Sequence, residues 1–166
     1  MTTQSTYETI EPQRIEKNVK PFIISGLSMK CTTSNDLKNA QSLWLELGLY
    51  MGKINNQIDN ISYGLCLEID EGIGIEYLAG VEVSEDVDLP EGFITKRLPE
   101  FNYAVFEHQG HVSTIFQTCD SIWKEWIPKS EVTKPEGANF FFERYGEGFD
   151  PISGKGDIEI WVPVEL

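Results

Sequence analysis

The feature that most constrains the fold of this chain is an internal repeat, in which a strand, a helix and two further strands occur twice. In the first half, the residue patterns predict a strand at 22–27, a helix at about 34–53 and strands at 62–68 and 76–83. In the second half, they predict a strand at 102–107, a helix at about 112–127 that Pro128 ends, and strands at 139–145 and 157–164. Local matches support the repeat, since residues 43–47 (Leu-Trp-Leu-Glu-Leu) resemble residues 122–126 (Ile-Trp-Lys-Glu-Trp).

The repeat predicts an α+β fold of duplicated βαββ units with pseudo-two-fold symmetry. Neither unit alone could fully bury both a sheet face and a helix stripe, so we expect one antiparallel sheet with two helices and a central ligand groove. The 166 residues then form a single domain, with repeat one at about 19–84, repeat two at about 98–166 and an N-terminal segment at 1–18. An acidic connector at 84–99 joins the repeats, and Gly-rich turns, one of them around Gly72 and Gly74, join the last two strands of each.

Composition excludes several classes of function. With 13 Lys and Arg against 27 Asp and Glu, and a formal net charge of -14, the chain is not suited to bind nucleic acid directly, because such binding requires basic residues that neutralise phosphates. It has neither an apolar run long enough for a membrane span nor an N-terminal secretory signal. Cys31, Cys66 and Cys119 are far apart and predict neither a zinc site nor a disulfide framework. We therefore expect a cytoplasmic protein that needs no cofactor or metal.

The most unusual segment is the aromatic strand at 139–145, which contains Glu143. Strand alternation places Phe141, Glu143 and Tyr145 on one face, so Glu143 is expected to be at least partly buried among aromatic rings. A buried carboxylate is costly unless it is paired or hydrogen-bonded. Two explanations remain open at this point. An internal salt bridge or contact with water satisfies Glu143, or an incoming cation supplies the missing charge and the rings add cation–π attraction.

Other candidate residues have plainer explanations. The tryptophans on the predicted helices, Trp44, Trp123 and Trp126, have helical spacing that is more typical of core residues than of ligand contacts. His108 and His111 lie at the start of the second helix, where a helix-entry turn is favoured over an acid/base pair with a neighbouring glutamate. The sequence contains no nucleophile elbow, dinucleotide-binding motif or phosphate-binding loop.

Four segments together resemble a known family. They are residues 142–145 (Phe-Glu-Arg-Tyr), 157–164 (Asp-Ile-Glu-Ile-Trp-Val-Pro-Val), 103–110 and 122–126. In this order they are similar to the gyrase-inhibitor-like (GyrI-like) effector-binding domains, which also occur as the drug-sensing half of AraC-type and MerR-type regulators. The resemblance extends from about residue 22 to residue 166.

The resemblance implies a duplicated βαββ fold and the binding of lipophilic or cationic small molecules in an aromatic cleft with a central acid. That acid corresponds to Glu143, and Tyr145 and Phe141 follow because they share its face. Trp126 and Tyr77 are weaker candidates for the ligand site. No helix-turn-helix accompanies the domain in this sequence, so the chain resembles the free-standing members, including those carried as integron cassettes.

Three hypotheses for function follow. The preferred one is a multidrug-binding module for hydrophobic cations, which acts as a sensor, as a sequestrant or in transcription regulation with a regulator protein or as a homodimer. The second is a hydrolase of small electrophilic compounds that uses Glu143 with Tyr145 as an acid/base pair. The third is a protein-binding inhibitor whose charge of -14 imitates nucleic acid. No residue is assigned a catalytic role in the preferred hypothesis.

Overall fold

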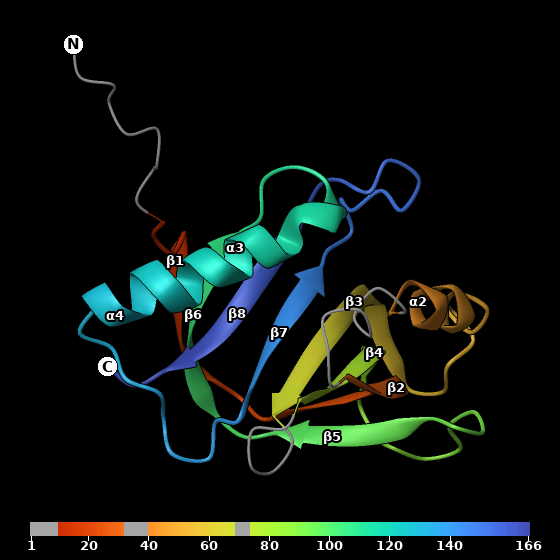
Figure 1. The fold of residues 1–166 in the computed structure, drawn as a ribbon. Helices are drawn as coiled ribbons and strands as arrows, with labels where there is room; N and C mark the ends of the chain where they lie inside the picture. Colours follow the sequence, from red (N-terminus) through yellow and green to blue (C-terminus); the bar gives the residue numbers. More distant parts are fainter. Residues whose placement is uncertain (1–9, 32–39, 69–73) are drawn as a thin grey trace.

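The computed structural model describes residues 10–31, 40–68 and 74–166, which form one curled antiparallel sheet and two helical segments (Figure 1). The sheet is eight-stranded in the described residues, with the order β1-β6-β8-β7-β3-β4-β2-β5. Its strands are β1 (Arg14–Val19), β2 (Phe22–Cys31), β3 (Gln57–Glu68), β4 (Ile75–Val83), β5 (Ile94–Leu98), β6 (Phe101–Glu107), β7 (Phe140–Tyr145) and β8 (Ile158–Val164).

The helical segments lie on one side of this sheet (Figure 1). The first is α2 (Ala40–Gly48), which packs against β2 and β4. The second runs from a 3-10 turn, η2 (Val112–Thr114), through α3 (Ile115–Ser121) and a π-helical turn, η3 (Ile122–Trp126), to α4 (Ile127–Lys129). No helix in the described part of the chain is both long and apolar enough to span a membrane.

The strand order is symmetric about the junction between β7 and β3, so the predicted α+β fold of duplicated βαββ units is confirmed. The first unit is β2, α2, β3 and β4, and the second is β6, the α3–α4 segment, β7 and β8. Leu65 on β3 pairs with Phe142 on β7 at this junction. The two units therefore meet through their equivalent strands, and residues near this pair belong to both halves of the domain.

Two strands that the repeat did not predict form the sheet edges, and each pairs with the other half. β1 precedes β2 in the chain but pairs with β6, whereas β5 precedes β6 but pairs with β2. β1 lies in the predicted N-terminal segment, and β5 lies in the predicted connector. Both strands are short and rich in charged residues, as is common for edge strands, so apolar patterning gave no signal for them.

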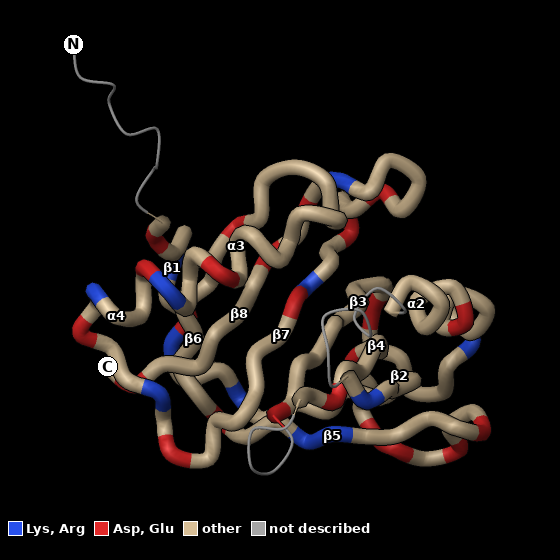
Figure 2. The backbone as a smooth tube through the Cα atoms, viewed as in Figure 1, with Lys and Arg blue, Asp and Glu red and all other residues tan. Residues whose placement is uncertain are grey.

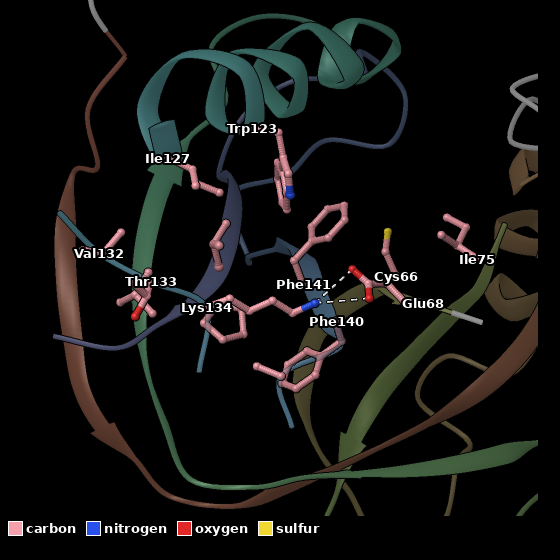
Figure 3. Close-up of a pocket in the computed structure, with 14 residues that line it drawn as sticks. Cys66, Glu68, Ile75, Trp123, Ile127, Val132, Thr133, Lys134, Phe140 and Phe141 are labelled. Atoms are coloured by element: carbon pink, nitrogen blue, oxygen red, sulfur yellow. Dashed lines mark hydrogen bonds and ion pairs between the residues drawn. The ribbon is translucent and has the colours of Figure 1, made fainter. Parts of the chain in front are cut away.

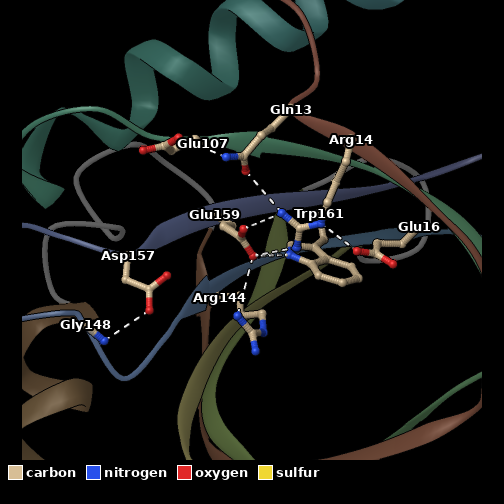
Figure 4. Close-up of polar contacts among 9 residues, drawn as sticks. All are labelled: Gln13, Arg14, Glu16, Glu107, Arg144, Gly148, Asp157, Glu159 and Trp161. Atoms are coloured by element: carbon tan, nitrogen blue, oxygen red, sulfur yellow. Dashed lines mark hydrogen bonds and ion pairs between the residues drawn. The ribbon is translucent and has the colours of Figure 1, made fainter.

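Arg14 anchors the exchanged strand β1 to the second half (Figure 4). Its guanidinium donates to Glu159 on β8 through Nη1 to Oε2 (2.8 Å) and Nη2 to Oε1 (3.3 Å). Trp161 Nε1 donates to the same carboxylate at 3.1 Å. Burial alone would raise the pKa of Glu159, but the hydrogen bonds from Arg14 and Trp161 outweigh it and lower that pKa. The pair is therefore charged and helps to fix β1 in place.

Element limits differ from the predictions in places. The described part of the first helix ends at Gly48, short of 53, and the predicted start of that helix at 34–39 and the turn residue Gly72 lie outside the described residues. The second helical segment continues past Pro128 to Lys129, so the prediction that Pro128 ends it is wrong. A proline removes a single N–H donor, and the next turn still closes because Ser130 N donates to Trp126 O at 2.9 Å.

Each face of the sheet carries a core. On the helix side, one cluster joins α2 to β2 and β4, and another joins the second helical segment to β6 and β8. The other face carries an aromatic cluster in which rings from non-adjacent strands touch. Phe142 on β7 lies 5.8 Å from Phe22 on β2 and 5.5 Å from Tyr103 on β6, measured between ring centroids. These contacts across intervening strands show how strongly the sheet curls.

Candidate ligand-binding site around Glu143

Glu143 lies at the junction of the two repeats, where it pairs with Gly64 across β7 and β3. Its side chain shares the helix side of the sheet with Tyr145 and Phe141, while Phe142 belongs to the opposite aromatic cluster. The face predicted from strand alternation is therefore confirmed. Glu143 is 7% exposed, so the predicted burial is confirmed as well.

Two tyrosine hydroxyls from different repeats hold one oxygen of this carboxylate. Tyr77 Oη on β4 donates to Glu143 Oε1 at 2.7 Å, and Tyr145 Oη on β7 donates to the same oxygen at 2.8 Å. Trp44 on α2 donates from Nε1 to Tyr77 Oη at 3.0 Å, and its ring meets that of Tyr145 edge-on at 5.3 Å. The network thus orients Glu143 by groups from both repeats and leaves Oε2 without a hydrogen bond among the described residues.

Gly64 makes room for this arrangement. A Cβ atom at this position would overlap both the Tyr77 hydroxyl and the Glu143 carboxylate. Because those two groups lie directly over the backbone of β3, the strand needs a residue without a side chain here. The hydrogen bond between Tyr77 and Glu143 therefore depends on glycine at position 64, although Gly64 has no side chain that takes part in it.

Burial dominates the electrostatics of the site. It raises the pKa of Glu143, and the hydrogen bonds from Tyr77 and Tyr145 offset only part of that rise. Burial, and then the nearby carboxylate, raise the pKa values of Tyr77 and Tyr145 far above the usual value, so both hydroxyls stay protonated and act as donors.

No ion pair compensates Glu143 within residues 10–31, 40–68 and 74–166. Two candidate cations, Arg144 beside it on β7 and Lys124 in the second helical segment, have other partners. Arg144 Nη1 lies 3.5 Å from Glu159 Oε1, and Lys124 Nζ lies 3.6 Å from Asp120 Oδ2. The internal salt bridge that the sequence left open is therefore not made by either of these residues.

Thiols form part of the surroundings of Glu143. Burial, and then the negative charge of Glu143, raise the pKa values of Cys66 and Cys119. A thiol with a raised pKa is a poor nucleophile and behaves as a small apolar side chain. Within the described residues, no group of His, Cys, Asp and Glu is arranged to hold a metal ion.

A pocket of about 180 Å³ lies next along β3 and β7, and Glu143 itself is not among the residues that line it (Figure 3). Cys66 and Phe141, which pair across β3 and β7, form its inner wall, and Trp123 and Ile127 cover it from the second helical segment. The rings of Trp123 and Phe141 lie 4.6 Å apart. Since Phe141 precedes Glu143 by two residues on the same strand face, the pocket begins one alternation step from the acid.

The structure brings together most, but not all, of the candidate residues. Glu143, Tyr145 and Tyr77 form the hydrogen-bonded centre, and Phe141 lines the pocket beside it. Trp126 instead packs edge-on against Phe106, at 5.0 Å, in the core of the second repeat. Residues 122–126 form a π-helical turn, which is wider than an α-helical one, so Trp126 does not share the face of Trp123 and its ring lies over β6 instead of lining the pocket.

Trp44 and Trp123, for which helical spacing favoured a core position, lie at the site, and Trp44 packs against the core as well. Trp44 bonds to Tyr77, and Trp123 lines the pocket and is 40% exposed. The repeat contained the signal, because the local match between residues 43–47 and 122–126 aligns Trp44 with Trp123. The same match aligns Trp126 with Leu47, which is 1% exposed in the core.

The histidines serve the start of the second helical segment. His108 Nδ1 lies 2.7 Å from Thr118 Oγ1 and its Nε2 lies 2.8 Å from His111 O, while Glu107 accepts from Gln13 Nε2 at 3.2 Å. His111 accepts a bond from Ser113 N at 3.0 Å as the cap of the 3-10 turn. The helix-entry prediction is confirmed, and the acid/base pair is not formed.

The chain is similar in sequence to a curated transcriptional regulator. Transcriptional regulator BrlR of Pseudomonas aeruginosa is 29% identical over 105 residues, which are 63% of this chain and 38% of the regulator. This chain thus aligns with well under half of the length of that curated relative.

Solved structures share the fold at low sequence identity. SAV2435 bound to tetraphenylphosphonium has a TM-score of 0.73 at 20% identity, over 92% of this chain and 93% of that one. The EcmrR C-terminal domain gives 0.62 at 14%, over 92% and 96%. An integron cassette protein from the Vibrio cholerae mobile metagenome gives 0.61 at 16%, over 95% and 100%. The model of the GyrI-like small molecule binding domain matches residues 13–165, so this chain belongs to the GyrI-like family of small-molecule-binding domains.

Proposed function

We propose that this GyrI-like domain binds hydrophobic cationic small molecules, with Glu143 as the residue that receives the positive charge, and acts as a sensor or sequestrant of such compounds. The observation that carries the proposal is the buried Glu143 carboxyl, which accepts two tyrosine hydroxyls and has no ion-pair partner in the described residues. A carboxylate held in that state is unfavourable for the empty protein and is stabilised when a cation arrives.

The surroundings of Glu143 favour a lipophilic cation over a hydrated one. Both tyrosine bonds go to Oε1, so Oε2 remains for the ligand. The neighbouring pocket presents Trp123 and Phe141, whose ring faces attract a desolvated cation and whose apolar area favours the apolar part of the ligand. The formal net charge of -14 adds a general attraction for cations, and Figure 2 shows acidic residues along many elements of the fold. The likeness to SAV2435 in its complex with tetraphenylphosphonium supports this class of ligand.

Glu143→Gln tests the proposal, because it removes the charge while keeping the shape of the side chain. Binding of tetraphenylphosphonium is measured by calorimetry and by quenching of tryptophan fluorescence. We expect the substitution to weaken binding by at least about 30-fold, since removing one partner of a buried charge pair costs about 2–5 kcal/mol.

Two controls separate charge recognition from general effects. Glu147→Gln removes an exposed charge from the turn after β7 and should change the affinity less than about twofold. Triphenylphosphine oxide, a neutral analogue of the cation, should bind equally to the native protein and to Glu143→Gln. Native affinity of Glu143→Gln for tetraphenylphosphonium would show that the carboxylate does not receive the charge.

The same contacts support a second candidate, hydrolysis of small electrophilic compounds. The 2.8 Å bond between Tyr145 and Glu143 places an acid and a potential base within proton-transfer reach, and the raised pKa of Glu143 lets it hold a proton nearer to neutral pH. In that case Glu143→Gln abolishes turnover but leaves ligand affinity nearly intact, which is the opposite of the pattern expected for simple binding.

A further inference from the structure

We propose that the site selects elongated ligands with two cationic ends and an apolar middle, with one end at Glu143 and the other at Glu68. This inference rests on the proposed role of Glu143 and names the ligand class more closely. Glu68 is a second carboxylate that lines the pocket, and its present partner is the Lys134 ammonium. A ligand cation takes the place of that ammonium.

The register of β3 sets the distance between the two carboxylates. Gly64, Cys66 and Glu68 alternate along β3 and therefore share the helix side of the sheet, and Gly64 pairs with Glu143. Four residues of strand separate Gly64 from Glu68, which corresponds to about 13 Å at the usual rise per residue. Glu143 lies over Gly64, so the two acids stand at the ends of a path of roughly that length along one strand.

The residues that lie between the two acids along the strands are apolar. Cys66 and Phe141 pair there across β3 and β7, and with Trp123 and Glu68 they line the pocket of about 180 Å³, which begins one alternation step from Glu143. This volume is below the roughly 300–1,000 Å³ of common small-molecule pockets, so among the hydrophobic cations of the proposed function the pocket favours those with a slender chain over bulky ones such as tetraphenylphosphonium. Figure 3 shows the Glu68 carboxylate and the Lys134 ammonium beside Cys66 and Phe141, next to this apolar wall.

The ion pair at Glu68 is weak enough for a ligand to displace. Lys134 Nζ lies 3.2 Å from each carboxylate oxygen of Glu68, and the two side chains are 52% and 58% exposed. Exposed pairs of this kind contribute little to stability, so the exchange of one cation for another costs little. A bound cation also keeps Glu68 neutralised in a protein whose formal net charge is -14.

The experiment compares decane-1,10-bis(trimethylammonium) with decyltrimethylammonium, which has the same chain and a single cationic end. Affinities are measured by calorimetry at one ionic strength for the native protein and for Glu68→Gln, Lys134→Met, Glu143→Gln and the control Glu91→Gln, which removes an exposed charge outside the pocket. Thermal melting checks that each variant is folded, and only folded variants enter the comparison.

We expect the native protein to bind the dication about tenfold more tightly than the monocation, of which about twofold arises because either end can enter first. Glu68→Gln should reduce the ratio of dication affinity to monocation affinity to about two. Lys134→Met should raise this ratio, because the ligand no longer competes with the Lys134 ammonium for Glu68, and Glu91→Gln should leave it unchanged. A ratio that does not respond to Glu68→Gln overturns the inference. If the monocation binds Glu143→Gln as well as it binds the native protein, the proposed function itself fails.

Discussion

Gly64→Ala tests whether the network around Glu143 is as tightly built as its contacts imply. The substitution adds one methyl group on the helix side of β3, where the Tyr77 hydroxyl and the Glu143 carboxylate already occupy the space. Neither group can move freely, because Tyr77 also accepts from Trp44 and Glu143 also accepts from Tyr145. We therefore expect the methyl group to break the bond between Tyr77 and Glu143.

The expected magnitude follows from that loss. A hydrogen bond to a charged group contributes about 1.5–3 kcal/mol, and forcing extra volume into a packed site costs about 1–3 kcal/mol. The lower backbone entropy of alanine in the unfolded chain returns about 0.4–1 kcal/mol. Gly64→Ala should thus lower the free energy of unfolding by about 1.5–5.5 kcal/mol and weaken cation binding.

Urea unfolding followed by tryptophan fluorescence measures the change, with Gly48→Ala as the matched control. Gly48 ends α2, and a Cβ atom there meets no other atom within 4 Å. That variant should be as stable as the native protein or slightly more stable, by up to about 1 kcal/mol. If Gly64→Ala behaves like Gly48→Ala in stability and in ligand affinity, the close packing at Gly64 does not hold Glu143, and the site needs another explanation.

Two further predictions follow from buried groups. Because burial raises the pKa of Glu143 above 4.5, the folded protein holds this proton more tightly than the unfolded chain, so the free energy of unfolding should fall as pH rises from 4.5 through the folded pKa. Glu143→Gln should be more stable than the native protein only above that range, which urea unfolding at about pH 4 and about pH 8 would show. The affinity of the native protein for a permanent cation should rise over the same pH range. Tyr103→Phe should raise the melting temperature and increase the free energy of unfolding by about 1–2 kcal/mol. The reason is that the Tyr103 hydroxyl is buried without a hydrogen-bond partner among the described residues. A clear loss of stability in that variant would mean that the hydroxyl is bonded in solution.

The sequence predicted the repeated part of the fold because apolar periodicity reports burial. β2, β3 and β4 and their counterparts β6, β7 and β8 all carry buried apolar residues, and all six were predicted. β1 and β5 lie at the edges, where charged side chains face water on an exposed strand, so their pattern resembles that of a loop. Their pairing partners could not be predicted either, because nothing local to β1 indicates that it joins the opposite repeat.

The centre of the candidate site could be predicted for a similar reason. Strand alternation alone places Tyr145 and Phe141 beside Glu143. Tyr77 approaches from another strand, and Trp44 from a helix, so the bonds between them depend on sheet register and on how α2 packs. The role of Gly64 is visible only in three dimensions, because a glycine that a neighbouring carboxylate requires has no sequence pattern of its own.

The exchange of β1 and β5 has a consequence for the order in which the protein can fold during its synthesis. β1 is made before the first repeat, yet its partner β6 is made only after the whole of that repeat. Pairing of β1 must therefore wait, and such distant pairing makes folding slow compared with that of proteins rich in local contacts. The surface where the repeats meet, and with it the environment of Glu143, is completed only after β7 has been made. A nascent chain that stalls before β7 would hold the whole first repeat but no Glu143 and therefore no ligand site.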